Sequence, residues 1–211
     1  FYLLADSAEN VEQLAEAAMA QSLEKPIQLL VELGIPGGRT GCRDLDQAML
    51  VARRVKSLEP HLALRGVEGY EALLRSKPEP EKSVRKFLGD LNELAARCSD
   101  EDLFSEGPVI FSAGGSDFFD LVLDQLEAPS GKQEVIRVIR SGCYLTHDSL
   151  NYSRIFEKIR KRSFLNKIHG LCIANEDRLL QDEDRMLQDE DRLLQDEDRL
   201  LQDEDRMLQH D

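Results

Sequence analysis

Short apolar runs alternate along most of this chain with segments in which apolar residues recur every three or four positions. The runs have the length of strands, and residues 27–33 (Ile-Gln-Leu-Leu-Val-Glu-Leu) form the most nearly continuous one. Such a run is typical of a strand buried on both faces of a parallel sheet. The pattern predicts strands at residues 1–5, 27–33, 61–64, 108–112 and 134–139.

The segments between these runs predict amphipathic helices at residues 8–22, 44–57, 83–98, 116–126 and 152–162. The third is the clearest, because its apolar residues from Val84 to Ala95 fall in phase. Ser7, Ser83 and the pair Ser116-Asp117 stand where a helix N-cap is expected. Pro78 and Pro80 are expected in the loop before the third helix.

The alternation of strand and helix repeats about five times, which favours an α/β fold with a parallel sheet and helical crossovers. Eight such units make a (β/α)₈ barrel of roughly 250 residues. Five units form either a smaller open sheet or part of a barrel. In both cases the loops after the strands meet at the carboxyl edge of the sheet, where such folds bind ligands.

One of these loops, residues 112–117 (Ser-Ala-Gly-Gly-Ser-Asp), has the features of a phosphate site. Gly114 and Gly115 let the backbone approach an oxyanion, and the first N–H groups of the next helix point outward. Ser112 and Ser116 add hydroxyl donors. The alternative is an ordinary βα turn capped by Ser116.

The following loop offers a second set of donors in Gly142, Cys143 and Tyr144. Phosphate sites of barrels are often shared by the last two βα loops, which favours the phosphate interpretation. Cys143 by itself is more typical of a small space-filling residue than of a nucleophile.

Two further loops place functional side chains at strand ends. Arg39, in the loop 37–41, suits a carboxylate, a phosphate or the ring nitrogen of a cofactor, or simply a surface salt bridge. Tyr70 suits packing against a planar ligand. His147 and Asp148 would point to opposite sides of a strand. His169 and Cys172 are too few to make a metal site.

The charge of the chain is uneven. The net charge is −14, of which −10 falls in residues 175–211 and −4 in the rest. The main body is therefore too acidic for a protein that binds nucleic acid. No apolar run approaches the roughly 20 residues of a membrane span.

The four cysteines lack paired metal spacing, so we expect free thiols and a cytoplasmic location. The first residues have no basic flank or cleavage site and do not resemble a signal peptide. The chain begins with Phe1 rather than methionine, so we expect it to be incomplete at this end.

Residues 175–211 form a separate segment of five near-identical seven-residue copies, joined to the body (residues 1–163) by a linker at 164–174. The apolar residues of each copy are adjacent, whereas a coiled coil needs them three and four apart. We interpret the repeat as a solvated acidic helix or a disordered tail. A weakly self-associating helix is the alternative, and with it a homo-oligomer.

Several loops together resemble the D-threonine aldolase and D-serine dehydratase family. The similarity lies in residues 37–41 (Gly-Gly-Arg-Thr-Gly), 66–71 (Gly-Val-Glu-Gly-Tyr-Glu), 112–120 (Ser-Ala-Gly-Gly-Ser-Asp-Phe-Phe-Asp) and 140–148 (Arg-Ser-Gly-Cys-Tyr-Leu-Thr-His-Asp), in the family's order. It extends over about residues 2–163. The resemblance implies the (β/α)₈ barrel of alanine racemase, here in part, with pyridoxal 5'-phosphate as cofactor and a small D-amino acid as substrate.

The resemblance also implies roles for residues. Arg39 would face the pyridine side of the cofactor, and Tyr70 would lie beside the ring or the substrate. The phosphate would be surrounded by Gly114, Gly115, Ser116, Gly142, Cys143 and Tyr144, with Ser112 in the same loop.

Two departures from the family affect the expected function. No lysine matches the family's Schiff-base lysine, whose amine holds the cofactor aldehyde. The family's His-x-Cys metal motif is also missing, so no metal role is transferred. We therefore expect a fragment of a D-amino-acid lyase that is inactive alone. A non-catalytic protein that binds phosphate, or a partner through its acidic tail, is the alternative.

Overall fold

The computed structural model describes residues 1–114, 117–127, 133–140, 154–155 and 158–159. The chain divides into two units, Phe1–Leu145 and Thr146–Asp211, and the first contains nearly all of the described residues. The acidic repeat and most of the predicted helix at 152–162 lie outside the described residues, so the predicted boundaries at 163 and 174 stay predictions.

Five parallel strands make the sheet of the first unit. They are β1 (Leu3–Ala5), β2 (Ile27–Leu33), β3 (Leu62–Gly69), β4 (Val109–Ala113) and β5 (Val135–Ile139). Each strand pairs with the next one along the chain, in the order β1-β2-β3-β4-β5. A barrel has this sequential order, whereas a doubly wound sheet reverses it at a switch point. The predicted α/β class and partial barrel are confirmed, with five strands and the helices after the first four of them in the described residues.

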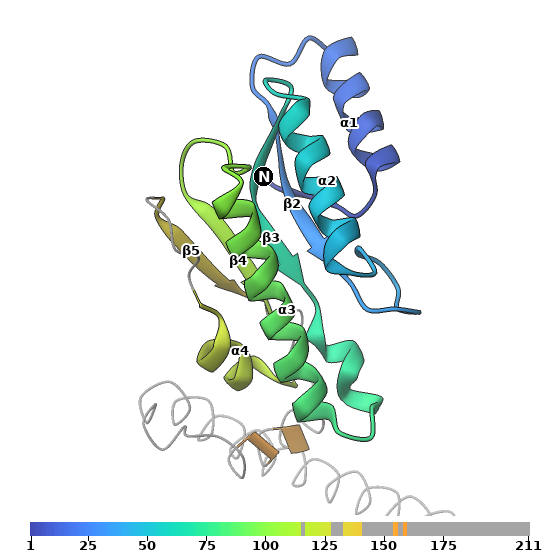
Figure 1. Cartoon of the computed structure of the whole chain (residues 1–211), viewed down its shortest axis with the longest axis vertical. Coiled ribbons are helices and arrows are strands. Elements are labelled where there is room, and N and C mark those ends of the chain that lie inside the picture. The colour runs from blue at the N-terminus through green and yellow to red at the C-terminus, as the bar shows by residue number, and fades with distance from the viewer. Residues whose placement is uncertain (115–116, 128–132, 141–153, 156–157, 160–211) are drawn as a thin grey trace, which may run out of the picture. The chain divides into compact units, whose positions relative to one another are not determined.

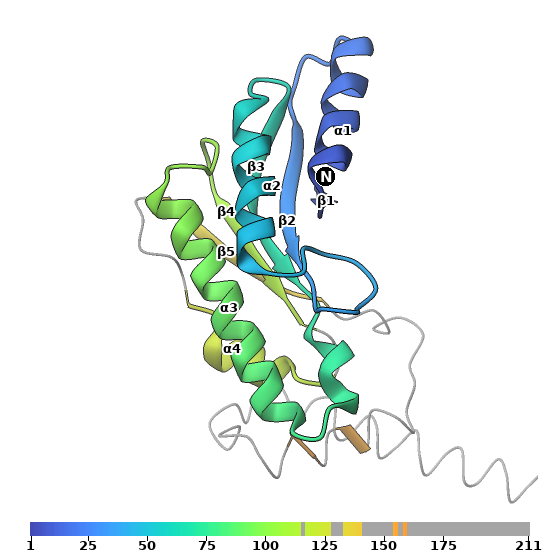
Figure 2. The ribbon, with the colours of Figure 1, turned by 45° about the vertical axis from the view of Figure 1, so that its right-hand side comes forward.

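Helices cover one face of the sheet. α1 (Ala8–Ala20), α2 (Leu45–Ser57) and α3 (Pro80–Asp100) lie side by side over it (Figures 1 and 2). Alternate strand residues such as Val31, Val67 and Phe111 are fully buried against these helices in a continuous core. Since successive side chains of a strand point to opposite faces, the residues between them line the face away from the helices. Among the described residues, no helix combines the length and apolar character of a membrane span.

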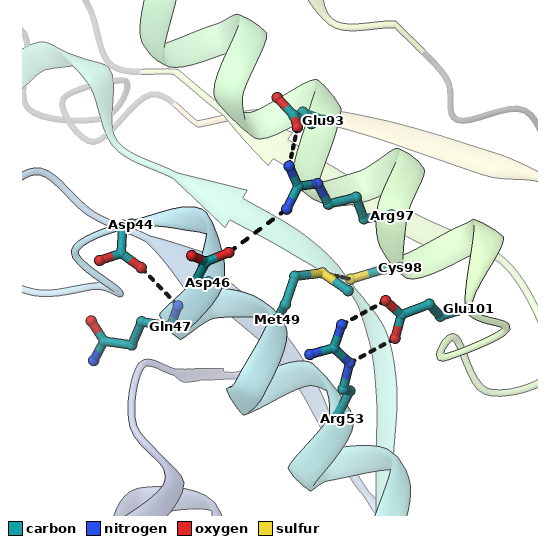
Figure 3. A network of polar contacts seen from close by, with 9 residues as sticks. All are labelled: Asp44, Asp46, Gln47, Met49, Arg53, Glu93, Arg97, Cys98 and Glu101. Atoms are coloured by element: carbon teal, nitrogen blue, oxygen red, sulfur yellow. Dashed lines mark hydrogen bonds and ion pairs between the residues drawn. The ribbon is translucent and has the colours of Figure 1, made fainter.

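The packing of α2 against α3 joins two of the covering helices. The sulfur atoms of Met49 and Cys98 lie 3.8 Å apart in the buried contact (Figure 3). Beside it, Arg53 donates to both carboxylate oxygens of Glu101 at 2.6 and 2.7 Å. This ion pair is half exposed, and such pairs contribute little, so apolar burial supplies most of the stability of the contact.

Two predicted helix starts are confirmed by their caps. The Ser7 hydroxyl accepts from the Asn10 amide at 3.2 Å, and the Asp44 carboxylate accepts from the Gln47 amide at 2.8 Å. These bonds satisfy amides that have no partner inside the helix.

The predicted start of the third helix is wrong. α3 begins at Pro80, and Ser83 lies in its first turn, with its amide bonded to the Glu79 carbonyl at 3.0 Å. Proline suits the first helical position, because its fixed backbone angle is helical and its missing N–H is not needed there. The fourth helix, α4 (Phe119–Gln125), begins three residues later than predicted.

The third strand is longer than predicted. Residues 66–69 belong to β3 rather than to a loop, and the loop begins at Tyr70, before the 3₁₀ helix η1 (Glu71–Ser76). The pairing of β2 with β3 shifts by one residue at Arg65, which leaves Gly66 opposite Leu30. Gly66 has φ +153°, and a Cβ on it would lie 1.8 Å from the Ile110 carbonyl oxygen. The glycine therefore permits a close approach of two strands and does not mark a turn.

Candidate active site at the strand ends

Two registered rows of side chains cross the face of the sheet that the helices leave uncovered. The first row is apolar and consists of Leu4, Leu30, Gly66, Ile110 and Ile136. The second row lies two residues nearer the carboxyl ends of the strands. It consists of Glu32, Glu68, Ser112 and Val138. The sheet thus changes from apolar to polar at the edge where barrels bind their ligands.

Arg140 ties three strands together at this edge. It directly follows β5, and its Nη1 pairs with Glu68 Oε1 and donates to the Ser112 hydroxyl at 2.8 Å. Its Nη2 donates to the Gly69 carbonyl at 2.9 Å. The Ser112 hydroxyl in turn donates to the Val138 carbonyl at 3.2 Å. Glu68 and Arg140 were not predicted as site residues, although both stand in the loop motifs that carry the family resemblance.

Two further carboxylates bind loop groups beside this cluster. Glu71 is fully buried, and its Oε2 accepts from the Gly114 amide at 2.9 Å. Glu32 Oε1 accepts from the Thr40 hydroxyl at 2.6 Å. The loops after β2, β3 and β4 are therefore held by buried acidic side chains.

Glu68 has an unusual electrostatic environment. Burial raises its pKa to about 7, and the neighbouring carboxylates of Glu32 and Glu71 act in the same direction. Arg140 opposes this shift and lowers the pKa, but it does not cancel the effect of burial. Glu68 Oε2 is buried and has no hydrogen-bond partner. An unsatisfied buried acceptor costs about 1–3 kcal/mol, so it calls for a physical reason.

The structure describes four of the predicted site residues. Ser112 and Gly114 lie at the end of β4 and belong to the cluster around Arg140 and Glu71. Arg39 is exposed in the loop after β2 and makes no hydrogen bond or ion pair with another described residue. Tyr70 directly follows β3 and is 37% exposed. The remaining predicted residues, Gly115, Ser116, Gly142, Cys143 and Tyr144, lie outside the described residues.

The described donors do not fit a phosphate group as they stand. The hydroxyl proton of Ser112 is engaged by the Val138 carbonyl, and the Gly114 amide is engaged by a carboxylate. A phosphate at Gly114 would have to replace the buried Glu71 side chain and would meet its negative charge. Both groups would have to be released before they could hold the phosphate of a cofactor.

The described residues include six lysines. Lys25 precedes β2, and the others lie in helices or directly after η1; they are Lys56, Lys77, Lys82, Lys86 and Lys158. None of these six directly follows a strand. The described residues also contain no group of three or more His, Cys, Asp or Glu side chains arranged to hold a metal ion.

Two described thiols are free, as predicted, and both are buried. Cys42, beside the strand ends, donates to the Asp6 carbonyl at 3.4 Å. Burial and the nearby Asp6 raise its pKa to about 12, so this thiol stays protonated and does not act as a nucleophile at neutral pH.

An open hollow of about 560 Å³ lies elsewhere, on the helix side of the unit. It is bounded by the end of β2 and the loop after it, the start of α2, η1 and the side of α3 that carries Phe87, and its lining includes Ile35, Asp46 and Lys86. No predicted site residue lines it. The polar row, rather than this hollow, occupies the position where the fold places its chemistry.

Comparison with known proteins identifies the fold. No protein-family model and no curated protein sequence matches the chain. Among solved structures, D-threonine aldolase from Filomicrobium marinum matches with a TM-score of 0.52 and 22% identity, over 72% of this chain and 38% of that one. D-threo-3-hydroxyaspartate dehydratase from Delftia sp. HT23 matches with a TM-score of 0.50 and 18% identity, over 73% and 38%.

These neighbours are enzymes of the kind that the sequence resembles, and the chain shares the fold of their barrel. At such low identity the likeness concerns the fold alone. The chain spans well under half the length of either neighbour.

Proposed function

We propose that this chain is part of a pyridoxal-phosphate enzyme that acts on small D-amino acids, and that the chain has little or no lyase activity by itself. One observation carries the proposal: a buried polar row lies at the carboxyl ends of β2–β4, in a sheet shared with D-threonine aldolase. The reaction would be β-elimination or retro-aldol cleavage of a β-hydroxy amino acid.

The cofactor belongs to this proposal through the resemblance of the strand-end loops. Pyridoxal phosphate, when bound, supplies the electron sink for the reaction. Of the predicted cofactor-binding residues that the structure describes, Arg39 and Tyr70 have side chains exposed for contact with it. Because Ser112 and Gly114 are engaged within the chain, phosphate binding would depend on the loops at 115–116 and 142–144.

The expected inactivity follows from the amine that this chemistry requires. A lysine at a strand end holds the aldehyde and exchanges it for the substrate. None of the described lysines stands in that position.

We also propose that the protein is located in the cytoplasm, because the free thiols of Cys42 and Cys98 suit a reducing compartment.

The test is turnover by the full chain. The protein is incubated with pyridoxal phosphate and either D-serine or D-threonine, and pyruvate and glycine are measured. We expect product no faster than with free pyridoxal phosphate, while D-threonine aldolase under the same conditions turns over D-threonine. Turnover that requires the protein would contradict the proposal that the chain is inactive by itself. Because the substrate is D-serine or D-threonine, the same result would support the proposal that the chain belongs to an enzyme of D-amino acids.

A further inference from the structure

The polar row contains a hydrogen-bond acceptor that the chain does not use. Glu68 is 4% exposed, its Oε1 is paired with Arg140, and its Oε2 has no partner. The surrounding groups that could compete for a ligand are engaged: Glu32 with Thr40, and Glu71 with Gly114. The unused hydrogen-bond acceptor of this cluster is therefore Glu68 Oε2.

The charges around Glu68 favour a cation. Glu32 and Glu71 both act on Glu68 as like charges, and Arg140 is the cation that opposes them. Arg140 is itself bonded to Ser112 and to the Gly69 carbonyl, which anchors it in one position. Burial and the two like charges disfavour the ionised form of Glu68, which a further positive charge at its free oxygen would stabilise.

We propose that Glu68 Oε2 accepts a hydrogen bond from the ammonium group of an amino acid bound at the strand ends. One free acceptor oxygen offers one charge-assisted hydrogen bond, which an N–H donor satisfies. A divalent metal ion would instead need several oxygen ligands at once. The inference rests on the proposed function for the identity of the ligand, but it needs neither the cofactor nor turnover.

The proposal is tested by calorimetric titration of the full chain at pH 8 without pyridoxal phosphate. D-Serine is compared with D-glycerate, which has a hydroxyl in place of the ammonium. We expect D-serine to bind at least about tenfold more tightly, since a charge-assisted hydrogen bond is worth about 1.5–3 kcal/mol. Glu68→Gln should reduce the affinity for D-serine about tenfold and leave that for D-glycerate unchanged.

Two controls separate Glu68 from general effects of charge. Glu16→Gln removes an exposed carboxylate on α1 and should leave D-serine binding unchanged. A chelator in the cell should have no effect; loss of binding with the chelator would mean that a metal ion occupies the site and would overturn the proposal.

Proton release gives a readout that does not depend on a variant. A cation beside Glu68 favours its ionised form, so D-serine binding to the wild type near pH 7 should release protons. Titration in two buffers of different ionisation enthalpy measures that release. No binding of D-serine, equal affinity for both ligands, or binding without proton release would each overturn the proposal. Such a result would leave the turnover experiment, and the proposed function, to be judged separately.

Discussion

Glu68 gives the folded state a specific pH dependence. Its pKa is raised from the ordinary 4.5 to about 7, so the folded chain binds a proton there that the unfolded chain has lost. The stability contributed by this group is complete below pH 4.5 and is lost as the pH rises to about 7, by on the order of 1–3 kcal/mol. Urea unfolding from pH 5 to pH 8 should show this decline in the wild type and a flatter profile in Glu68→Gln. Parallel profiles would contradict the assignment.

Arg140 should matter more than an ordinary surface arginine. Arg140→Met leaves Glu68 without its ion-pair partner, so we expect a loss of about 1–3 kcal/mol at pH 8 and a smaller loss at pH 5.5, where Glu68 is protonated. Arg54→Met, which removes an exposed ion pair with Glu12, should cost under about 1 kcal/mol at either pH. Chemical denaturation of the two variants provides the comparison, and equal losses would contradict the role of Arg140.

At the scale of elements, the absence of a side chain at Gly66 allows β3 to lie close to β4. In Gly66→Ala the new Cβ would lie 1.8 Å from the Ile110 carbonyl oxygen, so the strands must separate. We expect a loss of more than about 3 kcal/mol, or failure to fold. Gly89→Ala is the matched control, because a Cβ there meets nothing within 4 Å and alanine favours the helix by up to about 1 kcal/mol. Circular dichroism melts would contradict this if the two variants behaved alike.

The cap of α2 offers a second test at this scale. Asp44→Ala removes the bond to the Gln47 amide (Figure 3) and should destabilise the protein by about 1 kcal/mol. Ser83→Ala lies inside the first turn of α3 and should change stability by less than about 0.5 kcal/mol. A larger loss of stability for Ser83→Ala than for Asp44→Ala would contradict this assignment and support Ser83 as the N-cap of α3.

The sequence predicted the elements better than it predicted their contacts. Apolar periodicity located all five strands, because a buried parallel strand needs a continuous apolar run. It did not show that β3 continues past Gly66, since a glycine reads locally as a turn and only the neighbouring strand reveals the close approach. The row from Glu32 to Ser112 depends on the one-residue shift at Arg65, which no local pattern records.

The candidate site was predicted only in part, because its contacts join residues that are distant in the sequence. Ser112 and Gly114 lie at the polar edge of the sheet, as their motif suggested. Local sequence presented them as free donors, whereas Glu71 and Val138, distant in the chain, already engage them. Glu68 was not predicted as a site residue because its motif was interpreted as a loop, and only the pairing of β3 with β2 and β4 aligns it with Glu32 and Ser112.

At the scale of the whole molecule, the described residues combine five parallel strands and four helices of a barrel with a strand-end cluster held by its own carboxylates. The proposal that this chain is an inactive part of a D-amino-acid enzyme adds that it does not hold the cofactor covalently. The acidic repeat at 175–211 stays a predicted tail, with self-association as its alternative.

Covalent attachment of the cofactor is best measured by the intact mass of the full chain after incubation with pyridoxal phosphate and reduction with borohydride. The reduction traps any Schiff base as a stable adduct on lysine. We expect scattered, substoichiometric labelling that does not concentrate at one position. One adduct per chain on a single lysine, with the absorbance of an internal aldimine before reduction, would contradict the proposal that this chain is inactive by itself.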